Sequence, residues 1–367
     1  MKVLQLGKFY PVRGGVEKVM WDITDGLSAK GVWCDMLCAD FDGTGERIVP
    51  LNDNGRCMVV PSQGMLASTM ISPKMISWMR SRSNEYDIVH VHHPDPMACL
   101  ALRLSGFKGK VVLHWHSDIL RQKFFLKFYR PLQSWLIKRA DRILCTSPVY
   151  AEESEPLRNS RNKISVLPIG IDRVQPDPEG EAGIRARYGD KKIVYSLGRL
   201  IGYKGYQYLV EAASYLSDEY VVVIGGDGPL REELESKIEN LGLGGKVSLV
   251  GRVEDSDLAA WYGACDVFCL SSIWKTEAFA IVQVEAMSCG KPIVATRIPG
   301  SGVSWVNRDG FSGLNVEPRD AKALADAIME ICGEDYGKFS AGARERFAET
   351  FTKEKMIDNC LKIYETL

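Results

Sequence analysis

Short apolar runs alternate with segments of helical periodicity along the whole chain. The runs are rich in valine and isoleucine and show little apolar–polar alternation, which is typical of strands buried on both faces of a parallel sheet. Such an alternation of strands and helices predicts α/β units. The expected strands are 3–6, 32–37, 58–60, 88–91, 111–113, 143–145 and 164–167 in the first half, and 193–197, 220–224, 246–250, 267–270, 292–295 and 313–316 in the second.

A stretch rich in proline, glycine and aspartate, PIGIDRVQPDPEG at 168–180, separates the two halves and is typical of a linker. A chain of 367 residues is also long for a single domain. We therefore expect two doubly wound domains, 1–172 and 173–350. A final helix at about 353–367 has an apolar stripe that needs a partner surface, formed by Met356, Cys360, Leu361 and Tyr364.

The net charge of −1 gives no global attraction to nucleic acid. Residues 1–172 contain 23 Lys+Arg and 17 Asp+Glu (net +6), and the remainder contains 23 and 30 (net −7). The basic first half favours an anionic partner, unless this is only ordinary variation between halves. Ten scattered cysteines without CxxC spacing, no leader peptide and no apolar run of about 20 residues predict a cytoplasmic protein with free thiols.

Two loops of the second half follow predicted strands and carry candidate ligand-binding residues. Arg199 and Lys204 lie in LGRLIGYKG, where a guanidinium and an ammonium suit a diphosphate; an exposed basic loop is the alternative. Gly226 and Asp227 lie in GGDGP, where glycine lets backbone approach a ligand closely. Asp227 either binds a substrate hydroxyl or caps the helix expected near Pro229.

Glu277 and Glu285 are separated by seven residues in EAFAIVQVE. Residues 280–287 are predicted to be helical, which puts Glu277 just before the helix and Glu285 inside it. The two carboxylates suit the sugar and ribose hydroxyls of one ligand, while the free amides of Phe279 and Ala280 suit a phosphate. Ordinary surface glutamates are the alternative.

In the first half, Gly14 and Gly15 follow the first strand and open a helix, a position that favours an anion. The spacing is not GxGxxG with an acidic residue about 20 positions on, so a dinucleotide fold is poorly supported, and a tight turn is the alternative. His114 and His116 end a strand and share one face. We interpret them as contacts to a phosphate or sugar hydroxyl, or as core histidines, and the cluster His90, His92 and His93 as structural.

No metal site is predicted. Asp40-Phe-Asp42 and Asp255-Ser-Asp257 spell DxD, which can hold a metal bound to a diphosphate, but so short a pattern often arises by chance. Residues 119–142 contain seven basic residues and one acidic residue, interleaved with aromatics. This composition suits an anionic membrane surface, with an ordinary core helix as the alternative.

Several motifs in a fixed order resemble those of glycosyltransferase family 4. They are FYPVRGGVEKV, HWHSD, PIGID, GRLIGYKG, GGDGP and EAFAIVQVEAM with SCGKPIVAT, and they span nearly the whole chain. The resemblance implies the GT-B fold, in which two Rossmann-like domains face a central cleft. It also implies that the final helix, 351–367, crosses back onto the first domain.

The resemblance further implies retaining transfer of a hexose from a UDP- or GDP-sugar to a glycan acceptor, without a metal or other cofactor. Family members usually have glycine where this chain has Ala280, which narrows the fit of the donor. Carried over by motif, the roles are catalysis for His116, Arg199, Lys204 and Glu277, and donor binding for Gly14, Gly15, Gly226, Asp227, Arg252, Val253, Phe279, Ala280 and Glu285.

The basic aromatic segment predicts a lipid-linked acceptor at the inner face of the membrane, as in assembly of a surface polysaccharide. Two other functions remain open from the sequence. One is a nucleotide-sugar epimerase of the same fold, which needs no acceptor. The other is a catalytically silent carbohydrate-binding relative, against which the complete set of Arg199, Lys204, Glu277 and Glu285 argues.

Overall fold

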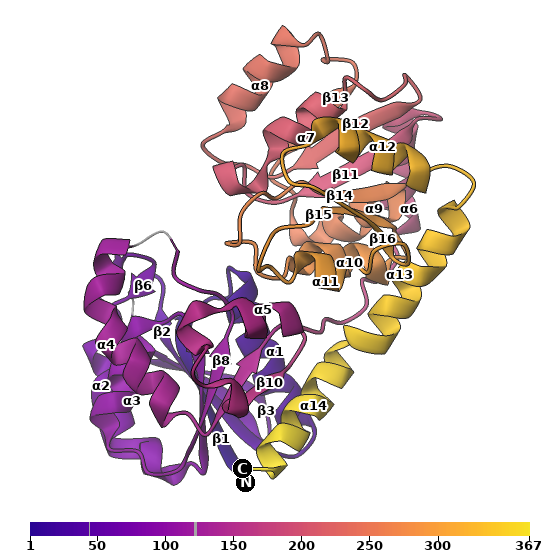
Figure 1. Cartoon of the computed structure of the whole chain (residues 1–367). Coiled ribbons are helices and arrows are strands. Elements are labelled where there is room, and N and C mark those ends of the chain that lie inside the picture. Colours follow the sequence, from indigo (N-terminus) through magenta and orange to yellow (C-terminus); the bar gives the residue numbers. More distant parts are fainter. Residues whose placement is uncertain (44, 121–122) are drawn as a thin grey trace. The chain divides into compact units, whose positions relative to one another are not determined.

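The computed structural model describes residues 1–43, 45–120 and 123–367, without the side chains of 123–125 (Figure 1). The described chain divides into two compact units. One comprises Met1–Gly170 together with Lys353–Leu367, and the other comprises Ile171–Thr352. The first stretch therefore ends slightly before the expected boundary at residue 172, and the C-terminal segment belongs to the first unit.

The first unit is built on an eight-stranded sheet in the order β10-β9-β8-β7-β1-β2-β4-β3, whose strands are parallel except for the antiparallel pair of β3 with β4. Its strands are β1 (Lys2–Tyr10), β2 (Trp33–Asp40), β3 (Arg47–Asn52), β4 (Gly55–Val60), β7 (Ile88–His93), β8 (Lys110–Trp115), β9 (Arg142–Cys145) and β10 (Ile164–Val166), with a small hairpin of β5 (Met65–Leu66) and β6 (Thr69–Met70). Its helices are α1 (Gly15–Ala29), α2 (Pro73–Arg82), α3 (Pro96–Ser105), α4 (Lys123–Arg139), α5 (Pro148–Glu153) and α14 (Lys353–Glu365).

The second unit has a six-stranded parallel sheet in the order β13-β12-β11-β14-β15-β16. Its strands are β11 (Lys192–Leu197), β12 (Tyr220–Gly225), β13 (Val247–Gly251), β14 (Val267–Leu270), β15 (Ile293–Thr296) and β16 (Gly313–Val316). Its helices are α6 (Pro178–Tyr188), α7 (Tyr206–Ala212), α8 (Arg231–Asn240), α9 (Leu258–Ala264), α10 (Ile281–Ser288), α11 (Val303–Val306), α12 (Ala321–Ile331) and α13 (Tyr336–Thr350). The prediction of two Rossmann-like α/β sheets is confirmed.

Among the residues that the structure describes, four helices begin with the same local device, a serine or aspartate followed by proline. Asp95 accepts hydrogen bonds from the amides of Met97 and Ala98, both 3.0 Å long, at the start of α3. A capping side chain satisfies amides that have no partner within the helix, and proline at the next position has no amide to satisfy. The other three helices that begin in this way are α2, α5 and α6, capped by Ser72, Ser147 and Asp177.

This device explains one difference from the sequence-based prediction, at α6, and an edge strand is a second difference with another cause. The side chain of Asp177 accepts a hydrogen bond from the amide of Gly180, so the last part of the expected linker is the first turn of α6.

The edge strand β3 was not among the predicted strands. It has alternating exposure and pairs antiparallel with β4, and Pro50 within it argues against a strand when only the sequence is considered. Asp40 at the end of β2 pairs with Arg47 of β3, at 2.5 Å.

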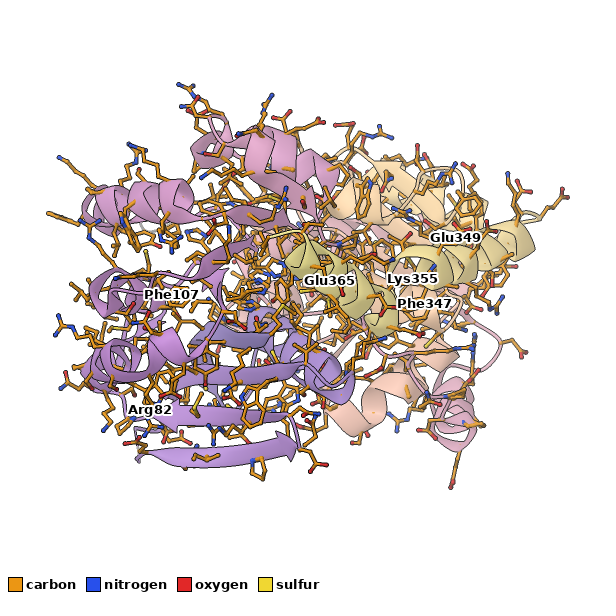
Figure 2. All side chains as sticks on the ribbon, turned by 90° about the horizontal axis from the view of Figure 1, so that it is seen from below. Arg82, Phe107, Phe347, Glu349, Lys355 and Glu365 are labelled. Carbon is orange, nitrogen blue, oxygen red and sulfur yellow. The ribbon has the colours of Figure 1, made fainter. Side chains whose placement is uncertain are left out.

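The C-terminal helix α14 packs against α1 within the first unit (Figure 1; Lys355 and Glu365 mark its two ends in Figure 2). Lys353 at its start forms ion pairs with Asp22 and Asp25 of α1, at 3.6 and 3.1 Å. Its buried side chains are Met356, Ile357, Cys360 and Tyr364. Ile357 therefore takes the place in the stripe that the sequence assigned to Leu361, which is only half-buried.

All ten cysteines are free thiols. No helix within the described ranges is both long and apolar enough to cross a bilayer.

The close contact of α1 with α14 gives a stability prediction at Gly26. A Cβ atom there would lie 2.5 Å from Cγ1 of Ile357, so Gly26→Ala should destabilise the protein by about 1–2 kcal/mol through overpacking. Gly183 in α6 is the matched control, because a Cβ atom there meets nothing within 4 Å. Gly183→Ala should instead stabilise the protein by about 0.5–1 kcal/mol. Urea denaturation measures both, and equal effects would rule out the contact as the cause.

Candidate functional site

The strand order of the second unit reverses between β11 and β14. In open α/β sheets, ligands bind beyond the carboxyl ends of the strands at such a reversal. The loop after β11 carries Arg199 and Lys204, and the loop after β14 carries Glu277. The fold therefore brings the predicted charged residues to the edge of the sheet where a ligand is expected.

Lys204 and Glu277 form a buried ion pair at this edge. Lys204 Nζ lies 2.5 Å from Glu277 Oε2, and Ser272 Oγ donates to the same oxygen at 2.9 Å. Only 9% of Lys204 and 8% of Glu277 is exposed. Burial by itself lowers the pKa of Lys204, but the Glu277 carboxylate outweighs it and holds this pKa above its ordinary value. Lys204 therefore stays charged, and loss of either side chain would leave its partner buried without its ion-pair contact.

Arg199 differs from Lys204 in being exposed. Its guanidinium pairs with no carboxylate among the residues that the structure describes. A fixed buried cation and an exposed arginine on one loop can together bind a diphosphate.

Glycines allow close backbone contact between the loops after β11 and β12, and between the loops after β11 and β14. A Cβ atom at Gly226, where φ is +130°, would lie 2.0 Å from the carbonyl oxygen of Gly198. One at Gly228 would lie 2.6 Å from the carbonyl oxygen of Leu200. Gly205, with φ of +67°, approaches the carbonyl of Ser271 equally closely. The motifs GRLIGYKG and GGDGP thus serve close backbone packing, which fixes the position of Lys204.

Asp227 is exposed and accepts a hydrogen bond from the amide of Gly228, at 2.8 Å. It does not cap α8, which begins only at Arg231 and has Leu230 at its cap position. The capping alternative is therefore wrong.

The helix that links the two glutamates begins one residue later than expected, at Ile281, with Ala280 as its cap. Ala280 has φ of +63°, a left-handed conformation that costs a non-glycine residue roughly 1–2 kcal/mol. This conformation accounts for the glycine that the family usually has there. Phe279 is buried with its ring 5.8 Å from that of Phe351, and its carbonyl accepts from Gln283 Nε2 at 2.8 Å.

Glu285 lies inside α10 and Glu277 before it, as predicted. The hydroxyl of Tyr262 on α9 donates to Glu285 Oε2 at 2.6 Å. Burial, followed by the charge of Glu285, raises the pKa of Tyr262, so this phenol keeps its proton. Tyr262 and Ser272 could not be predicted from the sequence, because nothing in their local sequence shows that they contact the glutamates.

The remaining predicted donor residues lie at two further strand ends. Arg252, after β13, is exposed and pairs with Glu254 at 3.0 Å, and Val253 is half-buried against Gly225. In the first unit, Gly14 is the cap residue of α1 and Gly15 is its first residue. A Cβ atom at Gly14 would lie 2.5 Å from Glu17 Oε2.

All five histidines of the chain lie on β7 and β8 or directly after them, and all are buried. His92 and His114 are partners in the parallel register, and the rings of His90, His92, His114 and His116 lie against one another. The ring of His93 stacks instead on that of Trp115, with 3.7 Å between the ring centroids. Burial lowers the pKa of every one of these imidazoles, to about 3 for His93 and His114, so all are neutral at pH 7.

Nitrogens of His90, His92 and His114 lie within 4.8 Å of one another, a grouping that could hold a metal ion. However, the rings of His90 and His92 are stacked at 4.7 Å with an interplanar angle of 18°. Because imidazole lone pairs lie in the ring plane, those of stacked rings run side by side and do not converge on one ion. Both nitrogens of His92 are also engaged in hydrogen bonds.

Two family models match the chain, one for each half. Residues 13–175 match the model described as Glycosyltransferase Family 4, and residues 181–354 match the model described as Glycosyl transferases group 1. A known protein, the O-antigen chain mannosyltransferase C of Escherichia coli, is 30% identical over 100% of this chain and 99% of its own length. The D-rhamnosyltransferase WbpZ of Pseudomonas aeruginosa is 31% identical over 96% of this chain and 92% of its own.

The fold is similar to those of solved structures. Sucrose-phosphate synthase from Thermosynechococcus elongatus superposes with a TM-score of 0.80 at 21% identity, over 100% of this chain and 99% of that one. Alr3699/HepE of Anabaena, solved in complex with UDP, gives a TM-score of 0.79 at 21% identity over the full length of both.

The left-handed conformation of Ala280 gives a second prediction. Ala280→Gly should stabilise the protein by about 1 kcal/mol, because glycine adopts this conformation without strain. Ala286→Gly, inside α10, is the control and should destabilise it, because glycine is unfavourable in a helix interior. Thermal unfolding measures both changes. Destabilisation by Ala280→Gly would show that the alanine methyl contributes more by packing than it costs in strain.

Proposed function

This chain belongs to the glycosyltransferases, and from that premise we propose that it transfers a hexose with retention from a UDP- or GDP-sugar to a lipid-linked glycan acceptor. The proposed setting is the synthesis of a surface polysaccharide on the cytoplasmic side of the membrane. The names of two relatives, an O-antigen chain mannosyltransferase and a D-rhamnosyltransferase, support a glycan product of this kind. The UDP complex of a structural neighbour supports a nucleotide-sugar donor.

The observation that carries the proposal is the buried pair of Lys204 and Glu277 beside the start of α10, at the reversal of strand order. Lys204 and Arg199 would stabilise the charge of the leaving nucleotide diphosphate, with help from the amides at the start of α10. Glu277 would contact hydroxyls of the donor sugar, and Glu285, held by Tyr262, would contact the ribose. Gly14 and Gly15 would approach the phosphates.

The proposed reaction needs neither a metal nor a protein nucleophile. The acceptor hydroxyl attacks the anomeric carbon from the side on which the diphosphate leaves, and a departing phosphate oxygen takes the hydroxyl proton. Catalysis then consists mainly of stabilising the negative charge that develops on the diphosphate. His116 of the first unit is proposed to accept a hydrogen bond from a substrate hydroxyl.

Substitutions at the ion pair separate catalysis from stability. Lys204→Met and Arg199→Ala should each lower kcat by about 10²–10³, because each removes a charge that stabilises the leaving group. Lys204→Met should also unfold more easily, since Glu277 is left buried and unpaired. The double variant Lys204→Met with Glu277→Gln should regain stability and remain inactive. Near-normal turnover in Arg199→Ala and Lys204→Met would contradict the mechanism.

A panel of UDP- and GDP-sugars, screened for protection against thermal unfolding, identifies the donor. One nucleotide class should raise the melting temperature, the protection should be lost in Glu285→Ala, and EDTA should not reduce turnover. Release of nucleotide and an altered sugar without acceptor would instead favour an epimerase. Absence of protection by every donor would favour the silent carbohydrate-binding relative.

Contact with a membrane surface is proposed for α4. Lys127, Phe128 and Arg130 are all exposed, and Phe128 is exposed to 69%. Exposed aromatic and basic side chains on one helix bind an anionic lipid surface through both burial and charge. Arg121, in the basic segment of the sequence analysis, lies outside the described residues, and so does the side chain of Lys123.

Vesicle flotation tests this contact. The triple variant Lys127→Gln, Phe128→Ser and Arg130→Gln should lose binding to vesicles that contain anionic lipid, with turnover on a soluble acceptor retained. Replacement of the exposed Lys322 and Lys338 of the second unit by glutamine controls for net charge and should have little effect. Equal flotation of the triple variant and the wild type would exclude the contact through α4.

A further inference from the structure

A chain of buried hydrogen bonds joins His116 to the C-terminal helix. His116 Nε2 lies 3.0 Å from His92 Nδ1, and His92 Nε2 lies 2.9 Å from the amide oxygen of Gln5. The amide nitrogen of Gln5 donates to the hydroxyl of Tyr364 at 3.0 Å, and that hydroxyl lies 2.5 Å from His90 Nδ1. Gln5 comes from β1, His90 and His92 from β7, and Tyr364 from α14, while His116 directly follows β8.

The direction of this chain follows from the chemistry of each group. The amide oxygen of Gln5 only accepts, so His92 must carry its proton on Nε2. A neutral imidazole has one proton, so His92 Nδ1 must accept, and His116 must donate from Nε2. On the other side of Gln5, the amide nitrogen donates to the Tyr364 hydroxyl at 3.0 Å and faces Cys34 Sγ at 3.7 Å, which fixes the orientation of the amide.

This direction leaves Nδ1 of His116 as an unprotonated acceptor. Nδ1 is buried and has no hydrogen-bond partner in the part of the chain that the structure describes. An unsatisfied buried acceptor is unfavourable, so it needs a partner from elsewhere. His116 is the residue directly after β8, at the edge of the sheet where its parallel strands end.

We propose that Gln5 and Tyr364 are positioning residues that hold His116 in the Nε2-protonated tautomer, so that its Nδ1 accepts a hydrogen bond from a substrate sugar hydroxyl. The role of His116 toward substrate rests on the proposed function, whereas the tautomer itself does not. Tyr364 in the last turn of α14 thus acts on His116, which is distant from it in the sequence, through the side chains of Gln5 and His92.

Long-range ¹H–¹⁵N correlation spectra of histidine-labelled protein test the tautomer directly. In the wild type, His116 should show a protonated Nε2 and an unprotonated Nδ1. Gln5→Met and Tyr364→Phe should each give a mixture of tautomers, because the direction of the chain is no longer fixed. The matched control is Gln133→Met, because Gln133 is also buried and also contacts a histidine, His93 at 3.1 Å, but lies outside the chain.

Activity supplies the second measurement. Gln5→Met and Tyr364→Phe should lower kcat about 10- to 100-fold, the usual effect of losing a partner that orients a histidine, with little change in KM for the donor. Gln133→Met should leave kcat nearly unchanged. A wild-type His116 protonated on Nδ1, or tautomers unaffected by both substitutions, would overturn the proposal.

The two measurements also separate this proposal from the proposed function. A tautomer switch with full turnover would overturn the positioning role, because His116 would then not contact the reacting substrate. If no nucleotide-sugar supports transfer, the proposed function fails, and the spectra still decide whether Gln5 and Tyr364 set the tautomer.

Discussion

In a parallel sheet every strand ends at the same edge, and this constraint organises both units. Side chains that lie far apart in the sequence become neighbours when they directly follow strands that are adjacent in the sheet. In the second unit this brings the loops after β11 and β14 together, with a cation from one and a carboxylate from the other. In the first unit it brings the ends of β7 and β8 together, which gathers the histidines.

The buried ion pair depends on surroundings that hold its geometry. Two charges taken out of water must keep good geometry, or the cost of removing them from water is not recovered. Two features hold this geometry. Gly205 and Gly226 let neighbouring loops approach so closely that a Cβ atom at either position would collide with a backbone carbonyl, and Ser272 donates a hydrogen bond to the Glu277 carboxylate. The strained Ala280 lies in the same region, and strain of this kind persists only where the surrounding structure determines the backbone.

Most of the fold could be predicted from the sequence, because short valine- and isoleucine-rich runs that alternate with longer helical patterns favour buried parallel strands. The sequence was less informative at β3, an edge strand with Pro50, and at α6, whose capping signal at Asp177 resembles a linker. For the site, strand ends predicted the positions of Lys204 and Glu277. Contacts such as Tyr262 with Glu285 and Gln5 with His92 join residues distant in sequence, and only the folded chain shows them.

The buried histidines have a consequence for how the first unit responds to acid. The folded chain keeps all five neutral, because burial lowers their pKa values, whereas the unfolded chain binds a proton at each near its ordinary pKa of 6.5. The unfolded state therefore takes up more protons as pH falls below about 6.5, and the free energy of unfolding falls with it. For His93 and His114 the loss continues down to their folded pKa of about 3. Folding of this unit is in effect a proton-releasing reaction in mild acid, which a positive slope of unfolding free energy against pH would reveal.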